Sequence, residues 1–274
     1  MTNSGSLTDL IDIGANLSHK SFDHDREDVM QSAKAAGVAH IIVTGTDLTS
    51  SREALRLASG SDGLSCTAGF HPHVANQCSD FELEQISTML QSDKVVAVGE
   101  TGLDFNRNYS PQADQERVYR QHLEIAIAVQ KPLFLHQRDA HDSFFAILKQ
   151  YRSQICGGVV HCFTDTEKAL DDYLELDMYI GITGWICDER RGRDLQQMVG
   201  KISPNRLLLE TDAPYLLPRN LNPRPKTRRN EPRYLTAVLE TVAQCTGRSV
   251  EQLAGETATN AKELFKLIPQ VAQG

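Results

Sequence analysis

Short apolar runs alternate with longer segments of mixed polarity along almost the whole chain. The runs are rich in Val, Ile and Leu and only three to five residues long, which is typical of buried strands. They lie at residues 10–13, 40–44, 64–68, 95–98, 133–135, 158–160, 178–182 and 207–209. Eight such runs predict eight strands.

The segments between these runs carry apolar residues at helical spacing, with Ser, Thr or Gly near several ends. They predict helices at 25–36, 48–58, 82–90, 115–130, 143–151, 167–176 and 192–199, and three more at 232–245, 250–254 and 258–267. Regular alternation of strand and helix indicates parallel β/α units. Eight units within 274 residues predict a single-domain α/β protein, a closed (β/α)8 TIM barrel spanning 1–274, with 1–8 as a frayed lead-in. No G-x-G-x-x-G or Walker loop favours a nucleotide-binding sheet instead.

Composition narrows the class of protein. The net charge of −8 argues against a surface that binds polyanions all over, so attraction to an anionic substrate has to be local. No apolar stretch approaches the roughly 20 residues of a membrane span, and residues 1–8 lack the layout of a signal peptide. Six cysteines without C-x-x-C spacing are typical of reduced thiols in a cytoplasmic protein. Without any sign of oligomerisation, we expect a monomer.

Four of the predicted strands end in residues that bind metals. Glu100, His136, His161 and Asp212 follow the fourth, fifth, sixth and eighth strands. In a barrel the carboxyl ends of the strands meet at one face, where Glu100, His136 and His161 are expected to be metal ligands. Asp212 is either a further ligand or a proton acceptor. Singly, each is open to a structural reading as a cap, an ion-pair partner or a core histidine.

Other polar residues belong near the same face. His71 and His73 flank a proline after the third strand, and His71 is the better candidate for contact with a phosphate or a leaving group. His73 is a further candidate for phosphate binding, although an ordinary loop also fits this stretch. Asp12 and Asn16 flank the end of the first strand and are candidates for the metal side of the site or for a second metal. Asp12 fits a backbone hydrogen bond equally well.

A basic loop follows the strand that carries Asp212. Residues 219–233 hold six cations in an acidic chain: Arg219, Arg224, Lys226, Arg228, Arg229 and Arg233. A basic rim over a metal centre would collect phosphates, and Arg228 and Arg229 are the candidates here. Arg107 is a second phosphate candidate. Trp185 and Tyr215 are candidates for base stacking, with packing as the alternative.

Seven motifs, taken in order, carry a family resemblance. They are Ile-Asp-Ile-Gly-Ala-Asn-Leu, Gly-Phe-His-Pro-His, Gly-Glu-Thr-Gly-Leu-Asp, His-Gln-Arg-Asp-Ala, His-Cys-Phe-Thr, Leu-Glu-Thr-Asp-Ala-Pro-Tyr-Leu and Arg-Asn-Glu-Pro. Together they closely resemble the TatD family of metal-dependent deoxyribonucleases, over roughly residues 10–265.

The resemblance implies an amidohydrolase-like barrel and a magnesium- or manganese-dependent 3′-to-5′ exonuclease that favours single-stranded DNA or RNA ends. It implies Glu100, His136 and His161 as ligands, Asp212 as the acidic residue of the last strand, and His71 on the substrate side. Many relatives carry His-x-His after the first strand, where this chain has Gly14-Ala15-Asn16. That departure argues against a tightly held second ion, and a site with fewer nitrogens suits Mg²⁺ or Mn²⁺.

The expected reaction is hydrolysis of a phosphodiester by a metal-activated water, with Asp212 taking the proton. Two alternatives stay open at this point. One is ester hydrolysis in the same barrel, such as deacylation of a mischarged tRNA. The other is a non-catalytic nucleic-acid-binding module.

Overall fold

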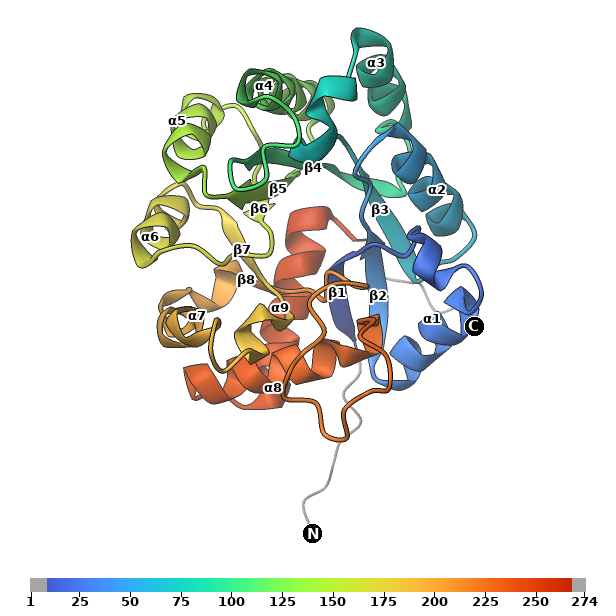
Figure 1. The fold of residues 1–274 in the computed structure, drawn as a ribbon, viewed down its shortest axis with the longest axis vertical. Coiled ribbons are helices and arrows are strands. Elements are labelled where there is room, and N and C mark those ends of the chain that lie inside the picture. The colour runs from blue at the N-terminus through green and yellow to red at the C-terminus, as the bar shows by residue number, and fades with distance from the viewer. Residues whose placement is uncertain (1–8, 268–274) are drawn as a thin grey trace.

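The computed structural model describes residues 9–267, and its centre is an eight-stranded parallel sheet (Figure 1). The predicted lead-in at 1–8 lies outside the described residues. The strands pair in sequence order from β1 to β8, and a parallel bridge between Ala15 and Ala213 brings β1 beside the segment that follows β8. The predicted (β/α)8 barrel is thereby confirmed. Its strands are β1 (Leu10–Ala15), β2 (Val38–Val43), β3 (Leu64–Ala68), β4 (Val95–Asp104), β5 (Leu133–Arg138), β6 (Gly158–Val160), β7 (Tyr179–Ile182) and β8 (Leu207–Leu209).

Most helices surround the barrel, and the last one lies over its centre in the view of Figure 1. Several begin at a side chain that accepts a hydrogen bond from the first turn: Asp47 from Ser50, Thr166 from Ala169 and Ser249 from Gln252. They are α1 (Arg26–Ala35), α2 (Leu48–Ser59), α3 (Asp80–Met89), α4 (Gln112–Val129), α5 (His141–Tyr151), α6 (Glu167–Glu175), α7 (Arg193–Met198), α8 (Leu235–Thr246) and α9 (Val250–Phe265). Short 3-10 turns η1 (Lys20–Phe22), η2 (Pro72–Gln77), η3 (Gly184–Cys187), η4 (Val199–Lys201), η5 (Pro204–Arg206) and η6 (Pro232–Tyr234) lie between them.

The apolar core has two parts. The larger part fills the space between the strands and the surrounding helices. The smaller part lies inside the barrel, where Ile13, Phe134 and Leu208 pack with Leu264 and Phe265 of α9. Helix α9 therefore closes the barrel at the amino ends of the strands, which leaves the opposite mouth to polar groups.

Many predicted bounds differ from the observed ones by a few residues, and two predicted elements differ most. The fourth strand runs on to Asp104 because residues beyond Glu100 pair with β5, as in Thr101 with Leu135. Glu100 therefore lies within β4. The two helices predicted at 250–254 and 258–267 are one helix, α9, since apolar residues bury at helical spacing on both sides of Gly255. Within the described residues, no helix is long and apolar enough to cross a membrane.

Candidate metal centre

Glu100 is a buried carboxylate in the middle of β4. The strand can lie close to β5 here because glycines flank Glu100. Gly99 and Gly102 have φ of +142° and +144°, and a Cβ on either would collide with a backbone carbonyl of β5. Only glycine adopts this conformation readily. Burying a carboxylate in such a position is costly unless donors or cations face it.

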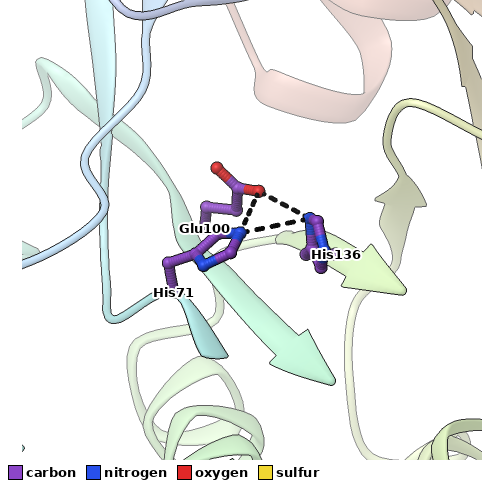
Figure 2. Close-up of side chains that lie close together, drawn as sticks. All are labelled: His71, Glu100 and His136. Atoms are coloured by element: carbon purple, nitrogen blue, oxygen red, sulfur yellow. Dashed lines mark hydrogen bonds and ion pairs between the residues drawn. The ribbon is translucent and has the colours of Figure 1, made fainter. Parts of the chain in front are cut away.

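Three imidazoles face one oxygen of that carboxylate. Oε1 of Glu100 lies 2.9 Å from Nδ1 of His136, 2.8 Å from Nε2 of His161 and 3.3 Å from Nε2 of His71. His71 and His136 also approach each other, with 3.3 Å between Nε2 and Nδ1. Figure 2 shows His71 and His136 pointing at Glu100 from either side. His136 and His161, two of the predicted ligands, therefore both contact the third, Glu100, at the same oxygen.

His71 lies closer to this oxygen than the sequence indicated. Its ligand atom and those of Glu100 and His136 all lie within 4.8 Å of one another, an arrangement that could hold a metal ion, and His161 lies outside this set of three. The side chain is held by its own turn, because Nδ1 of His71 accepts a hydrogen bond from the His73 amide at 3.0 Å. This leaves Nε2 of His71 directed at the carboxylate.

The protonation of the cluster is set by its charges. Burial alone would raise the pKa of Glu100, but His161, His71 and His136 outweigh it and hold this pKa well below its usual value. Burial would lower the pKa of His161, yet the carboxylates of Glu100 and Glu210 raise it well above normal. Burial lowers the pKa of His71 to about 4 despite the attraction of Glu100. The carboxylates thus favour positive charge here, which a divalent cation would supply in place of protons.

The residues present fit a divalent cation. The donors are imidazole nitrogens and a carboxylate oxygen, a combination that binds first-row metals. In addition, Nε2 of His136 is buried without a hydrogen-bond partner among residues 9–267, and Oδ2 of Asp104 is 3.5 Å away. Unpartnered buried nitrogens are rare in native proteins. A cation bound at Nδ1, which faces Glu100, would keep the proton of His136 on Nε2, where a small rotation of the ring would let it donate to Asp104.

Asp104 ties His73 to the same face. Oδ2 of Asp104 lies 2.7 Å from Nε2 of His73, and Oδ1 accepts the Arg107 amide at 2.8 Å. His73 therefore stands beside the cluster, 4.2 Å from His71 between ring centroids. Its imidazole contacts a carboxylate, and its predicted role in phosphate binding stays a prediction.

Glu210 is a residue that the sequence reasoning missed. It is fully buried, and Oε2 lies 3.3 Å from Nδ1 of His161 while Oε1 accepts the Cys162 amide at 2.5 Å. Two glycines make room for it: a Cβ on Gly14 would lie 2.6 Å from Oε2, and one on Gly181 would lie 2.5 Å from Oε1. Glu210 thus orients His161 from behind. The sequence signal for Glu210 was an acidic residue directly after an apolar strand, two residues before Asp212.

Asp212 and Asn16 meet at the same mouth. The Asn16 amide donates to Oδ1 of Asp212 at 3.0 Å. Burial, with Glu100 and Glu210 nearby, raises the pKa of Asp212 to about 7 against the opposing effect of His161. Asp12 is fully buried as well, but both of its oxygens accept hydrogen bonds from Thr211, at 2.9 Å from the amide and 2.6 Å from the hydroxyl. Asp12 therefore links β1 to the segment after β8.

The phosphate candidates are placed differently from one another. Arg228 and Arg107 are exposed. Arg229 is engaged internally, since its guanidinium donates to Asp25 at 2.6 and 2.8 Å and to Glu231 at 2.9 Å. Because these contacts fix Arg229 between the basic loop and the start of α1, its charge is already balanced. Arg228 and Arg107 are the better placed for a phosphate.

Comparison with known proteins gives consistent matches over almost the full length. The family described as TatD related DNase matches residues 11–266. The chain is 47% identical over 256 residues to a protein of Klebsiella pneumoniae named 3′-5′ ssDNA/RNA exonuclease TatD, covering 93% of this chain and 97% of that protein. It is 44% identical to the Salmonella typhimurium protein of the same name, covering 94% and 100%.

Solved structures agree. A TatD homologue of Escherichia coli, YJJV, superposes with a TM-score of 0.87 at 29% identity, covering 96% of this chain and all of that one. A β-aspartyl dipeptidase of Fervidobacterium islandicum superposes with a TM-score of 0.57 at 12% identity, covering 95% of this chain and 73% of that one, and shares the fold alone. The likeness therefore extends from close relatives to a more distant hydrolase barrel.

Proposed function

The chain belongs to the TatD family of related DNases, and from that premise we propose that it is a metal-dependent 3′-to-5′ exonuclease acting on single-stranded DNA and RNA. The observation that carries the proposal is the meeting of Glu100 with three imidazoles at the open mouth of the barrel. Relatives that share 44–47% of its residues carry this activity in their names. Its six free cysteines support a reducing, cytoplasmic setting.

Glu100, His136, His161 and His71 are the proposed holders of the ion. They offer one hard oxygen and three nitrogens, which is more nitrogen than Mg²⁺ prefers, so of the two ions expected from the family resemblance the proposed one is Mn²⁺. When bound, the ion supplies charge to the phosphoryl oxygens and makes an attacking water more acidic. Glu100 and the imidazoles fix its position, and Glu210 fixes His161 in turn.

Asp212 is the proposed proton acceptor. A general base works best when its pKa lies near the working pH, and burial with Glu100 and Glu210 raises the pKa of Asp212 to about 7. The Asn16 amide holds one of its oxygens, which leaves the other free to face a water or a substrate. Arg228 and Arg107, both exposed, are proposed to attract the phosphates of the strand.

The test uses single-stranded oligonucleotides labelled at the 5′ end, with DNA and RNA run in parallel. Wild-type protein should shorten both stepwise from the 3′ end, lose activity in EDTA and regain it with Mg²⁺ or Mn²⁺. His136→Asn should lose at least 100-fold in rate. The matched control is His141→Asn, since His141 pairs with Asp172 at 2.8 Å outside the site. Equal activity of the two variants, or activity that persists in EDTA, would refute the proposal.

A further inference from the structure

A hollow of about 350 Å³ opens beside the histidine cluster. Its lining includes His136, His161 and Asp212 from the candidate site, together with two aromatic residues, Trp185 and Tyr215. This volume lies at the lower end of the range for small-molecule pockets, which begins at about 300 Å³. The space is suited to a single nucleotide and not to a length of strand.

The indole of Trp185 is fixed before any substrate arrives. Its Nε1 donates to the Arg191 carbonyl at 3.2 Å, and the Arg191 guanidinium lies 4.5 Å from the ring centroid. Arg191 is held in turn by Asp188, 2.8 Å from its Nε. A ring held in this way loses little side-chain entropy when a base stacks on it.

Tyr215 lines the same hollow and is 52% exposed. Its amide donates to the Asp212 carbonyl at 2.9 Å, and His19 packs against its ring edge-on, with the centroids 5.9 Å apart. Tyr215 is therefore placed directly beside the proposed general base. With half of its surface exposed, the ring of Tyr215 is accessible to a ligand in the hollow.

Trp185 and Asp165 line both this inner hollow and an outer one of about 450 Å³, whose lining also includes Glu167, Asp194 and Arg191. Asp188 contacts both Arg191 and Arg219, so it balances Arg191 only in part, while Glu167 is paired with Lys201. Asp165 and Asp194 outnumber Arg191 and leave the outer hollow negative. A phosphate that passed beyond Trp185 would meet like charge at short range, within the reach of electrostatic repulsion.

We propose that the inner hollow binds the 3′-terminal nucleotide of the substrate, with its base stacked against Trp185 and Tyr215, and that the acidic outer hollow stops the strand from running further. This inference rests on the proposed nuclease function and deepens it. Stacking tolerates every base, because each has a π face. The acidic far wall accounts for a preference for chain ends, since an internal stretch of strand would force a phosphate into it.

The first test compares two substrates that differ only at the 3′-terminal residue, a normal nucleotide against an abasic sugar. Wild-type protein should discriminate against the abasic end by about 5- to 100-fold in kcat/KM. Trp185→Ala should reduce this ratio towards 1, Tyr215→Ala should reduce it in part, and Trp185→Phe should restore it. An abasic sugar at the next position inward should cost much less in every protein. Phe81→Ala is the matched control, because Phe81 is an exposed aromatic residue of α3, 59% exposed.

The ratio of kcat/KM on the two substrates distinguishes a misfolded variant, a failure of the base subsite and a failure of the nuclease function. A misfolded variant loses rate on both substrates equally, so its ratio does not change for that reason. Wild-type protein that degrades no oligonucleotide would overturn the proposed function itself. Wild-type protein that degrades both substrates at one rate, or Trp185→Ala that keeps the full ratio, would overturn the base subsite while the nuclease function stands.

The second test addresses the acidic wall. A 3′-phosphate adds negative charge where the strand is proposed to stop, so wild-type protein should cleave such an end more slowly than a 3′-hydroxyl end. The double variant Asp165→Asn, Asp194→Asn should narrow that difference by removing both charges. A difference that stays unchanged in the double variant would overturn the role of the outer hollow.

Discussion

Replacing Glu210 by glutamine keeps the shape of a fully buried side chain and removes its charge. In the wild type, Oε1 accepts the Cys162 amide and Oε2 faces Nδ1 of His161 at 3.3 Å. When an ion takes the place of the proton on Nε2, which lies 2.8 Å from Glu100, the Glu210 carboxylate keeps the remaining proton of His161 on Nδ1. Glutamine has one acceptor and one donor. If its oxygen keeps the Cys162 amide, its NH2 faces Nδ1 and drives the proton to Nε2.

Moving the proton of His161 to Nε2 should reduce the affinity of the site for a metal ion. Partners behind a metal-bound histidine typically contribute 10- to 100-fold in metal affinity. We expect Glu210→Gln to weaken Mn²⁺ binding by this factor while the protein stays folded. Calorimetric titration with Mn²⁺ measures the affinity, and 15N-detected NMR of the imidazoles reports which nitrogen of His161 carries the proton.

Two further variants make the result specific. Gly181→Ala places a Cβ 2.5 Å from Oε1 of Glu210, so it should displace the carboxylate and weaken Mn²⁺ binding in the same direction. Asp12→Asn alters another buried carboxylate, whose oxygens bond Thr211 and Gly14, and should leave the tautomer of His161 unchanged. Unchanged metal affinity and an unchanged tautomer in folded Glu210→Gln would refute the reasoning.

Three other outcomes follow from the structure. Asp212→Asn should fold normally and lose at least 100-fold in kcat, as measured on labelled oligonucleotides, and near-normal turnover would remove Asp212 from the chemistry. His122 is fully buried, accepts the Phe70 amide at 3.1 Å and has its pKa lowered by burial from 6.5 to about 4. Its folded pKa lies below the unfolded one, so its contribution is present above pH 6.5 and is lost towards pH 4, by about 3 kcal/mol. Denaturant titrations between these pH values should therefore show a smaller loss for His122→Asn, and an equal loss would contradict the assignment. Arg229→Gln should lower the free energy of unfolding by about 1–2 kcal/mol, because Asp25 and Glu231 lose their partner. Arg228→Gln should leave stability unchanged and weaken oligonucleotide binding at low salt. If Arg228→Gln instead lowered stability and Arg229→Gln weakened binding, the structural role would belong to Arg228 and the phosphate contact to Arg229.

The barrel was predictable because its signal is repeated. The runs at 64–68, 158–160 and 207–209 have the same bounds in the structure, since each is an apolar stretch buried on both faces. The fourth strand was predicted too short because Glu100 looks like an end by polarity. Pairing with β5, which the sequence does not display, carries the strand to Asp104.

The site was predictable in part for a related reason. Glu100, His136 and His161 stand out as polar residues beside apolar strands, and the topology of the barrel brings them to one point. The approach of His71 depends on the conformation of η2, where Nδ1 accepts the His73 amide. Local sequence does not specify that turn.

The roles of two charged residues could not be predicted from the sequence. Glu210 looked like part of a motif, and only its contact with His161 shows what its charge does. Arg229 looked like its neighbour Arg228 in a basic run, yet it pairs with Asp25, 204 residues away in the chain. Contacts between residues so far apart in sequence follow from the closed fold and not from local pattern.

Anomalous diffraction from crystals soaked in Mn²⁺ locates the ion relative to Glu100 and the imidazoles. We expect a strong peak at the mouth of the barrel, about 2.0–2.3 Å from an oxygen of Glu100 and from nitrogens of at least two of His71, His136 and His161. An anomalous peak elsewhere, in a protein that degrades single strands in Mn²⁺, would show that Glu100 and the imidazoles do not hold the catalytic ion.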